Sequence, residues 1–233
     1  MRGFLPERIS FALPINYARS LSKQASFSSD VPPSKSQTKL EPKAMFTWEE
    51  AKQFCARLTR LLRAAMDEGG KEWPKEVAKH WIVRRPTDAE WSLAVGLEEE
   101  RGGTPKEKDL EIKGVYPWGT QWPPPSGAGN YGDLTCQQKY PGMPNIEGYV
   151  DGYAETAPVG SFKPNRYDLY DLGGNVWEWC EDWLDKEQKQ RVVRGASWRN
   201  GPPEGVLSSH RGSNVPNGRF QNIGFRVVLG AAP

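Results

Sequence analysis

The stretch from Asp171 to Trp179 (DLGGNVWEW) is the most informative part of the chain, because two tryptophans flank an acid directly after a Gly-Gly-Asn turn. Glycine permits positive φ angles and a close approach of neighbouring backbone. The tryptophans are expected to anchor a hydrophobic core. Glu178 and the carbonyl oxygens that precede it would suit a hard cation. From these residues alone, a tight turn with a hydrogen-bonded glutamate is the alternative interpretation.

The chain has 233 residues, of which 37% are hydrophobic, and it contains ten tryptophans. A polar composition can indicate disorder, but disordered chains are poor in aromatic residues. The 24 glycines and 20 prolines predict a loop-rich globular domain with few regular elements. A net charge of +2 gives no general case for nucleic-acid binding, and no apolar run is long enough for a membrane helix. We therefore expect neither nucleic acid nor membrane as a partner.

The three cysteines, Cys55, Cys136 and Cys180, are an odd number, so they cannot form a closed disulfide framework. Their spacing matches no zinc pattern. We expect three buried or free thiols, with one disulfide and one free thiol as the alternative. The two histidines, His80 and His210, are too few for a multi-histidine metal site.

The segment 1–44 differs from the rest of the chain, because it is rich in serine and arginine and has no tryptophan. Glu7, Arg8 and Pro14 interrupt the apolar stretch that a secretory signal needs. No signal peptide is predicted, so a cytoplasmic location is the expectation, although the composition faintly resembles a transit peptide. We expect residues 1–44 to be disordered or non-conforming and residues 45–233 to form the domain.

Two capping boxes, in which a hydroxyl precedes a carboxylate by three residues, predict helix starts at Thr47 and Thr87. The first helix should run to about Met66, and Gly96 should close the second. The region 102–162 has no sustained periodicity, which is unusual in a compact domain, so bound cations are the expected stabiliser. Two β-rich runs flanked by glycine predict strands, at residues 191–195 and 224–229.

Several motifs resemble those of the formylglycine-generating enzyme, or sulfatase-modifying factor, family, and they occur in the family's order over roughly residues 45–230. They are TWEEAKQFCARL (47–58), RPTDAEW (85–91), YPWG (116–119), APVG (157–160), YDLYDLGGNVWEWCEDW (167–183), RGASW (194–198), SHR (209–211) and NIGFRV (222–227). The resemblance implies an α+β, C-type lectin-like fold of the sulfatase-modifying factor type. Family members usually carry a longer strand region before the first helix, so it also implies an N-terminally truncated member.

The resemblance also concerns catalysis, because catalytic members carry two cysteines that bind copper(I) and activate oxygen. By position these cysteines would fall at Ser208 and near residues 203–205, but no cysteine follows Cys180. A serine hydroxyl cannot replace a thiolate as a redox group or copper ligand. The chain is therefore expected to lack the catalytic pair, and copper is an unlikely cofactor.

The resemblance implies structural calcium at two sites. The first set is Asn130, the Tyr131 carbonyl, Asp151 and the Tyr153 carbonyl, and the second is Asp171, the Gly174 and Val176 carbonyls, and Glu178. Carboxylates, an amide and backbone oxygens are the ligands that calcium prefers. The alternative is that Asp151 and Glu178 only cap turns.

In relatives, the loop equivalent to residues 200–220 lines the substrate groove, and exposed loops often carry recognition. Asn217, Arg219 and Arg211 are the candidate ligand-binding residues, with a structural salt bridge as the alternative for Arg211. The function expected first is a non-catalytic, lectin-like binding or scaffold domain for a peptide, protein or glycan. An oxidoreductase-type enzyme and a variable ligand-binding protein on the same fold are the alternatives.

Overall fold

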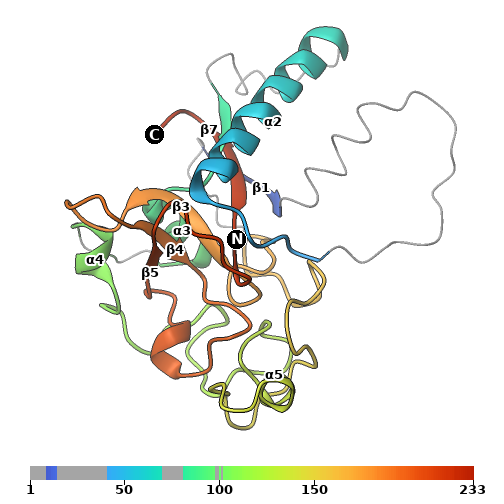
Figure 1. Cartoon of the computed structure of the whole chain (residues 1–233), viewed down its shortest axis with the longest axis vertical. Helices are drawn as coiled ribbons and strands as arrows, with labels where there is room; N and C mark the ends of the chain where they lie inside the picture. Colours follow the sequence, from blue (N-terminus) through green and yellow to red (C-terminus); the bar gives the residue numbers. More distant parts are fainter. Residues whose placement is uncertain (1–8, 15–40, 70–80, 98–99, 101) are drawn as a thin grey trace, which may run out of the picture.

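The computed structural model describes residues 9–14, 41–69, 81–97, 100 and 102–233 (Figure 1). Apart from α2, which has 22 residues, the regular elements are short and separated by long loops, as the glycine and proline content predicted. In chain order they are β1 (Ile9–Pro14), α2 (Trp48–Gly69), β2 (Ile82–Arg84), α3 (Asp88–Val95), α4 (Pro105–Lys108), α5 (Leu134–Lys139), β3 (Trp177–Trp183), β4 (Arg191–Arg194), the 3-10 helix η1 (Pro203–Val206), β5 (Gly212–Asn214), β6 (Ile223–Gly224) and β7 (Arg226–Gly230).

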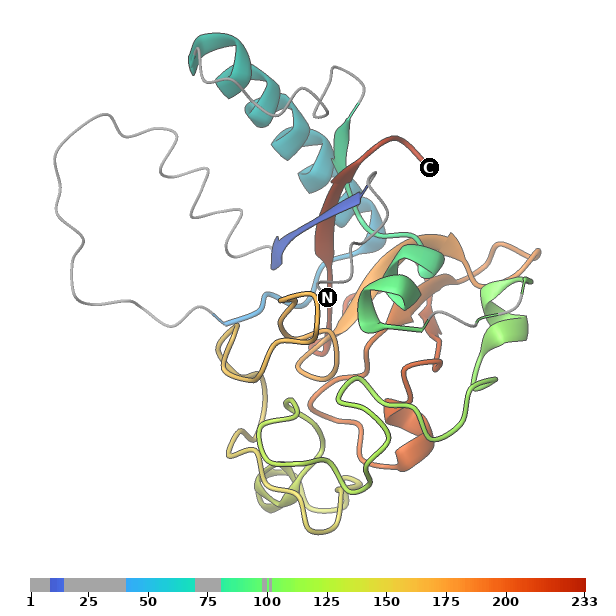
Figure 2. The same cartoon turned by 180° about the vertical axis from the view of Figure 1, so that it is seen from behind.

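The strands form two small sheets. In the first, β7 lies between β1 and β2 and runs antiparallel to both. In the second, the order is β5-β4-β3-β6, with β6 parallel to β3 and the other pairs antiparallel. Seen from behind, the three strands of the first sheet lie next to α2, and the loops fill the opposite half of the molecule (Figure 2). The fold is thus a loop-rich α+β arrangement.

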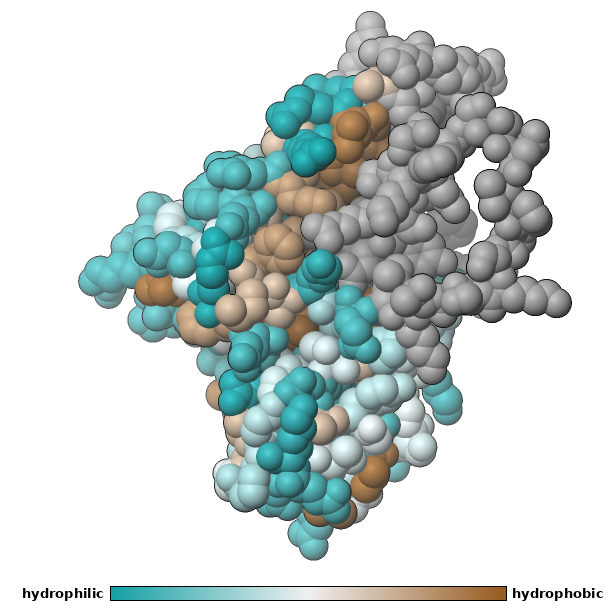
Figure 3. Space-filling model, turned by 45° about the vertical axis from the view of Figure 1, so that its right-hand side comes forward, coloured by the Kyte–Doolittle hydropathy of each residue, from teal (hydrophilic) through white to brown (hydrophobic). Residues whose placement is uncertain are grey.

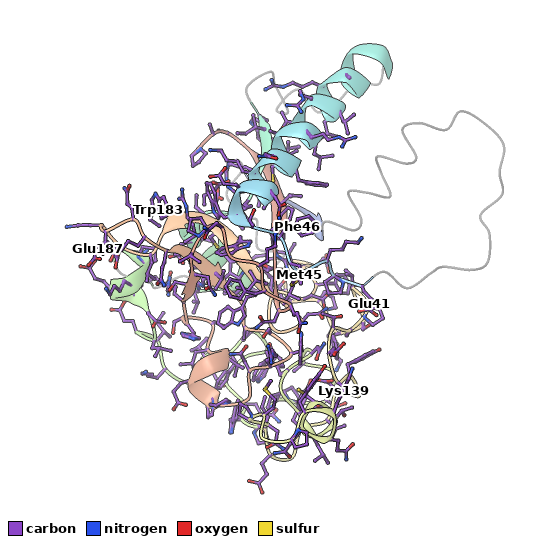
Figure 4. All side chains as sticks on the ribbon, in the orientation of Figure 1. Glu41, Met45, Phe46, Lys139, Trp183 and Glu187 are labelled. Atoms are coloured by element: carbon purple, nitrogen blue, oxygen red, sulfur yellow. The ribbon has the colours of Figure 1, made fainter. Side chains whose placement is uncertain are left out.

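A single C-terminal segment joins the two sheets, since only Phe225 separates β6 from β7. The Phe225 ring is 4% exposed and makes edge contacts with Phe46 and Phe54, at centroid distances of 5.6 and 5.8 Å. Phe46 and Met45 lie where the chain enters α2, at the junction between this helix and the body (Figure 4). The aromatic contacts therefore attach α2 to both sheets.

Helix α2 begins at the predicted capping box, in which Thr47 Oγ1 accepts from Glu50 N and Glu50 Oε2 accepts from Thr47 N. Trp48 is buried and donates from Nε1 to the Cys180 carbonyl at 2.8 Å. The guanidinium groups of Arg85 and Arg191 lie over its ring, 4.0 and 3.7 Å from the centroid. Apolar side chains gather along one side of the helix (Figure 3). The first turn of α2 is therefore fixed to β3 and β4.

Helix α3 also has the predicted capping box, formed by Thr87 and Glu90, and it ends at Gly96 with a φ of 95°. The left-handed conformation is accessible to glycine at little cost. Trp91, in the middle of the helix, is completely buried against Leu172 and Cys180. Both predicted helices and both predicted strands are present.

Several elements were not predicted, among them β2, β3, η1 and β5, and three more lie where the sequence predicted no regular structure. Strand β1 lies inside the segment 1–44, which we expected to be disordered or non-conforming; residues 1–8 and 15–40 lie outside the described residues. Helices α4 and α5 lie in the region expected to be irregular, and each is a short turn capped by a side chain, Thr104 or Asp133. Elements of four to six residues are too short to produce a periodic pattern. The division of the chain at residue 44 stays a prediction.

The described part of the chain has no helix that is both long and apolar enough to cross a membrane.

Candidate functional site

The second predicted calcium set lies at the start of β3, and its glutamate already has a cationic partner. Glu178 is 6% exposed and binds Arg226 through two short contacts, Oε2 to Nε at 2.6 Å and Oε1 to Nη2 at 2.7 Å. Trp91 Nε1 donates to Glu178 Oε2 at 3.1 Å. A bidentate guanidinium–carboxylate pair neutralises the charge that a cation would otherwise use.

Asp171 belongs to the same set and also lies near Arg226. Its Oδ2 accepts from Gly160 N at 2.8 Å, and its backbone carbonyl accepts from Arg226 Nη2 at 2.9 Å. Burial raises the pKa of the Asp171 carboxyl, because desolvation disfavours the charged form. Gly174 is held close to Asn130, since a Cβ there would lie 2.3 Å from the Asn130 carbonyl oxygen. The two predicted sets are therefore neighbours.

The first predicted set contains a buried oxygen without a partner. Asn130 is completely buried, and its Nδ2 donates to the Glu155 carbonyl at 2.6 Å and to Asn175 Oδ1 at 3.3 Å. Its Oδ1 has no hydrogen-bond partner among the described residues. A buried amide oxygen without a hydrogen bond destabilises the folded state, so the site is expected to receive a further donor or a cation.

Asp151 is the carboxylate of the first set. Its two oxygens accept from Tyr131 N and Tyr153 N, each at 2.9 Å, and its own N donates to Asp133 Oδ2 at 2.8 Å. Burial raises the pKa of Asp151 to about 7, and the negative charge of Asp133 adds to the shift. We call Asn130, Tyr131, Asp133, Asp151 and Asn175 the loop cluster.

The fit of the two sets to a hard cation differs. The loop cluster offers an unpaired amide oxygen beside a desolvated carboxylate, which fits calcium chemistry. In the second set, Arg226 already neutralises Glu178. Among the described residues, no group of three or more Asp, Glu, His or Cys side chains gathers as a metal site, so any such site would depend on amide and backbone oxygens.

The positions expected for the catalytic cysteines lie in and after η1. Ser208 is 1% exposed, its N donates to the Val115 carbonyl at 2.8 Å, and its carbonyl accepts from Arg194 Nη2 at 2.8 Å. Its hydroxyl is buried without a hydrogen-bond partner in the described part of the chain. The residue thus acts as a buried connection between β4 and the Val115 loop.

The three cysteines are free and buried, and they lie on different elements: Cys55 on α2, Cys136 on α5 and Cys180 on β3. Burial raises the pKa of Cys55 to about 12 and raises those of Cys136 and Cys180. High pKa values keep these thiols protonated and unreactive. Among the described residues, no two cysteines lie on the same element as a metal-binding pair.

The three candidate ligand-binding residues lie in different environments. Arg211 is 3% exposed, and its Nη2 lies 3.1 Å from Asp88 Oδ2 and 2.5 Å from Glu100 Oε1. Arg219 is exposed, and it contacts Glu50 Oε1 at 2.5 Å and the Met45 carbonyl at 2.9 Å. Asn217 is exposed on the loop before it. The structure therefore brings Asn217 and Arg219 to the surface and uses Arg211 as a buried ion-pair partner.

A buried polar centre that was not predicted from the sequence lies between α3, β4 and the segment before β5. Asp88 is 2% exposed and binds Arg194 and Arg211. Burial alone would raise the pKa of Asp88, but the two guanidinium groups outweigh it and hold the pKa below its usual value. We call Asp88, Glu178 and the arginines Arg194, Arg211 and Arg226 the arginine–carboxylate network. Asp88 was considered only as part of a capping box, and no local pattern shows its partners.

Fold and motifs together define a domain of the sulfatase-modifying factor type. The family model described as "Sulfatase-modifying factor enzyme 1-like domain" matches residues 15–231, so the chain belongs to this family.

The curated relatives include proteins named as inactive and proteins named as formylglycine-generating enzymes. "Inactive C-alpha-formylglycine-generating enzyme 2" of Bos taurus is 34% identical over 204 residues, which cover 83% of this chain and 52% of the relative. "Formylglycine-generating enzyme" of Thermomonospora curvata is 41% identical over 104 residues, covering 44% of this chain and 28% of that protein. The chain spans about half the length, or less, of these relatives.

Solved structures support the fold alone. "Crystal Structure of CarF" superposes with a TM-score of 0.53 at 22% identity, covering 96% of this chain and 86% of the other. "Treponema denticola variable protein 1" gives a TM-score of 0.51 at 23% identity, covering 88% of this chain and 76% of the other. At such identities the similarity does not transfer a ligand or an activity.

Proposed function

We propose that this protein is a non-catalytic member of the sulfatase-modifying factor family that serves as a binding or scaffold domain. The observation that carries the proposal is the absence of any cysteine after Cys180 in the 233 residues. Ser208, at the position expected for one of the two catalytic cysteines, is buried and offers a hydroxyl instead of a thiolate. Copper(I) prefers soft sulfur ligands, which this position does not supply.

The relatives named inactive support the same proposal, since a protein of that name is similar over 83% of this chain. The three thiols that the chain does have support it further, because they lie apart on α2, α5 and β3. In this proposal the ligand is a peptide, protein or glycan, and the exposed residues Asn217 and Arg219 contribute to its recognition.

Calcium is part of the proposal as a structural ion. In the loop cluster, Asn130 Oδ1 and the Asp151 carboxylate would hold it, with carbonyl oxygens of Tyr131 and Tyr153 as the expected further ligands. Its positive charge would stabilise the half-buried Asp151 carboxylate, which otherwise accepts only from N–H groups in the described contacts.

The test of the non-catalytic role is a turnover assay. The purified full chain is incubated with copper(I), oxygen and a peptide containing Cys-x-Pro-x-Arg, and the peptide mass is followed for conversion of cysteine to formylglycine. Formylglycine-generating enzyme of Thermomonospora curvata is the positive control, and copper without protein is the blank. We expect the peptide mass to match the blank. Conversion above the blank would contradict the proposal.

A further inference from the structure

A cavity of 460 Å³ opens among the loops, and one of its lining residues, Val115, accepts a backbone hydrogen bond from Ser208 N at 2.8 Å. Three loops line it, at residues 115–119, 125–129 and 162–173, together with the end of α3. This volume falls within the range of about 300–1,000 Å³ that is typical of small-molecule sites.

Three aromatic residues line the cavity, Tyr116 and Trp118 from the first loop and Phe162 from the third. The Trp118 indole is stacked on Tyr116, with a centroid distance of 4.9 Å and an interplanar angle of 3°. Its Nε1 donates to the Gln121 carbonyl at 2.8 Å. These contacts hold the indole in one orientation, so a flat ring can stack or pack against it without a large entropy cost.

Basic side chains outnumber acidic ones around the cavity. Lys163 and Arg166 line it and are exposed, whereas Asp171 is the one carboxylate among the described lining residues. The Lys163 side chain passes close to Gly127, with Cε 4.0 Å from the position that a Cβ would take there. The Asp171 carboxylate accepts from Gly160 N. An anionic group in the cavity would therefore meet a basic side chain.

Hydrogen bonds hold the third loop, residues 162–173, in place. Asn165 Oδ1 accepts from Tyr167 N at 2.9 Å and from Leu169 N at 3.2 Å, while its Nδ2 donates to the Ala94 carbonyl at 2.7 Å. Lys163 N donates to the Gly127 carbonyl at 3.3 Å. The cavity is thus preformed, which lowers the cost of binding.

We propose that this cavity binds a small organic anion that carries a flat ring, with the ring against Trp118 and Phe162 and the anionic group at Lys163. The anionic group is a carboxylate or a phosphate, since both pair with a lysine ammonium. The inference rests on the proposed binding function and deepens it by naming a site and a ligand class.

The proposal is tested by titrating the full chain with benzoate and with phenyl phosphate as anionic probes, and with benzyl alcohol as the matched neutral ring. Binding is measured by saturation-transfer NMR. Saturable binding is expected for at least one anion, and the better of the two identifies the anionic group. Lys163→Ala should weaken binding of that anion about fivefold and leave the neutral ring unaffected. Lys189→Ala is the control, because Lys189 is exposed and pairs with Glu187 in the turn between β3 and β4.

Ser126→Trp is the second variant, since Ser126 lines the cavity and is exposed, so a large side chain can fill the space without entering the core. We expect it to abolish binding of the anion while the thermal midpoint is preserved. Failure of both anions to bind, or binding that is unchanged in either variant, would overturn the proposal. Neither outcome alters the turnover assay, and turnover of the peptide would overturn the non-catalytic role without affecting this site.

Discussion

The arginine–carboxylate network and the loop cluster are both buried and polar, but their carboxylates have different partners. In the network, Asp88 and Glu178 each face at least one guanidinium group. In the loop cluster, Asp151 accepts from backbone N–H groups and lies near another carboxylate, Asp133. The pKa of Asp88 is lowered, and burial raises that of Asp151 to about 7. The network is electrostatically complete within the chain, whereas the loop cluster would be completed by an added cation.

Breaking the network should have the largest effect. Asp88→Asn keeps the shape of the side chain but leaves Arg194 and Arg211 buried without their shared countercharge. Removal of one partner from a buried ion pair costs about 3–5 kcal/mol. We expect a loss of this size in the free energy of unfolding, measured by urea denaturation.

The matched control is Asp185→Asn, which breaks the exposed pair between Lys106 and Asp185. Little change is expected, because solvent screens such pairs. Equal effects of the two variants would contradict the role of the network. Acid unfolding gives a second measurement: the folded-state pKa of Asp88 lies below the ordinary aspartate value of about 3.9, so its contribution is present above about pH 4 and is lost as the pH falls through the lowered pKa. The stability of the Asp88→Asn variant should therefore depend less on pH in that range.

Calcium should have the next largest effect, and it acts on the loop cluster. A ligand that binds only the folded state stabilises by about 2.7 kcal/mol at a hundredfold excess over its dissociation constant. For a domain of this size, this corresponds to a rise of about 5–11 °C in the thermal midpoint. We expect calcium to raise the midpoint relative to a chelator, and Asp151→Asn to remove that rise.

The same experiment compares the two predicted sets. In chelator, Asp151→Asn should destabilise the fold by about 1 kcal/mol or less at pH 8, because it removes a desolvated charge but its Nδ2 cannot accept from one of the two N–H groups that the carboxylate satisfies. Glu178→Gln should destabilise with and without calcium, since it breaks the pair with Arg226. If the calcium-dependent rise were lost only in Glu178→Gln, the second set would hold the ion. If wild type showed no rise, calcium would not be a structural ligand.

Local patterns predicted the parts of the fold that depend on neighbours in sequence. The capping boxes at Thr47 and Thr87 need only residues three positions apart, and both are present. The network could not be predicted in this way, because Asp88 meets Arg194 and Arg211 across 106 and 123 residues. The resemblance of its loop to one that lines a substrate groove placed Arg211 among the ligand candidates, with a structural salt bridge as the alternative, and the structure has the salt bridge. The burial of Arg211 depends on an acid supplied by α3.

The loop cluster illustrates the same limit. The family resemblance placed Asn130 and Asp151 in one predicted set, but the contact between Asn130 and Asn175 spans 45 residues and connects this set to the Gly-Gly-Asn turn. The unpaired oxygen of Asn130 follows from that packing and not from the residue type. The unpaired oxygen can be recognised only from the complete set of partners of the Asn130 amide.

The smallest expected effect concerns the threonines that cap α3 and α4, which differ in how deeply their helices are buried. Thr87 caps α3, whose central Trp91 is completely buried. Its partner Glu90 accepts from Thr87 N at 2.8 Å and also binds Arg84 at 2.6 Å. Loss of an N-cap side chain costs about 1 kcal/mol. We expect Thr87→Ala to lower the free energy of unfolding by about this amount and Thr87→Ser to restore most of it.

Thr104 makes the same capping box on α4, but that helix has four residues and the box is exposed to solvent. Water can satisfy the N–H groups that Thr104→Ala would release, and a helix of one turn contributes little packing to lose. We therefore expect Thr104→Ala to cost clearly less than Thr87→Ala in the same urea titration. A cost equal to that of Thr87→Ala would mean that the cap of the short helix α4 is as important for stability as the cap of the buried helix α3.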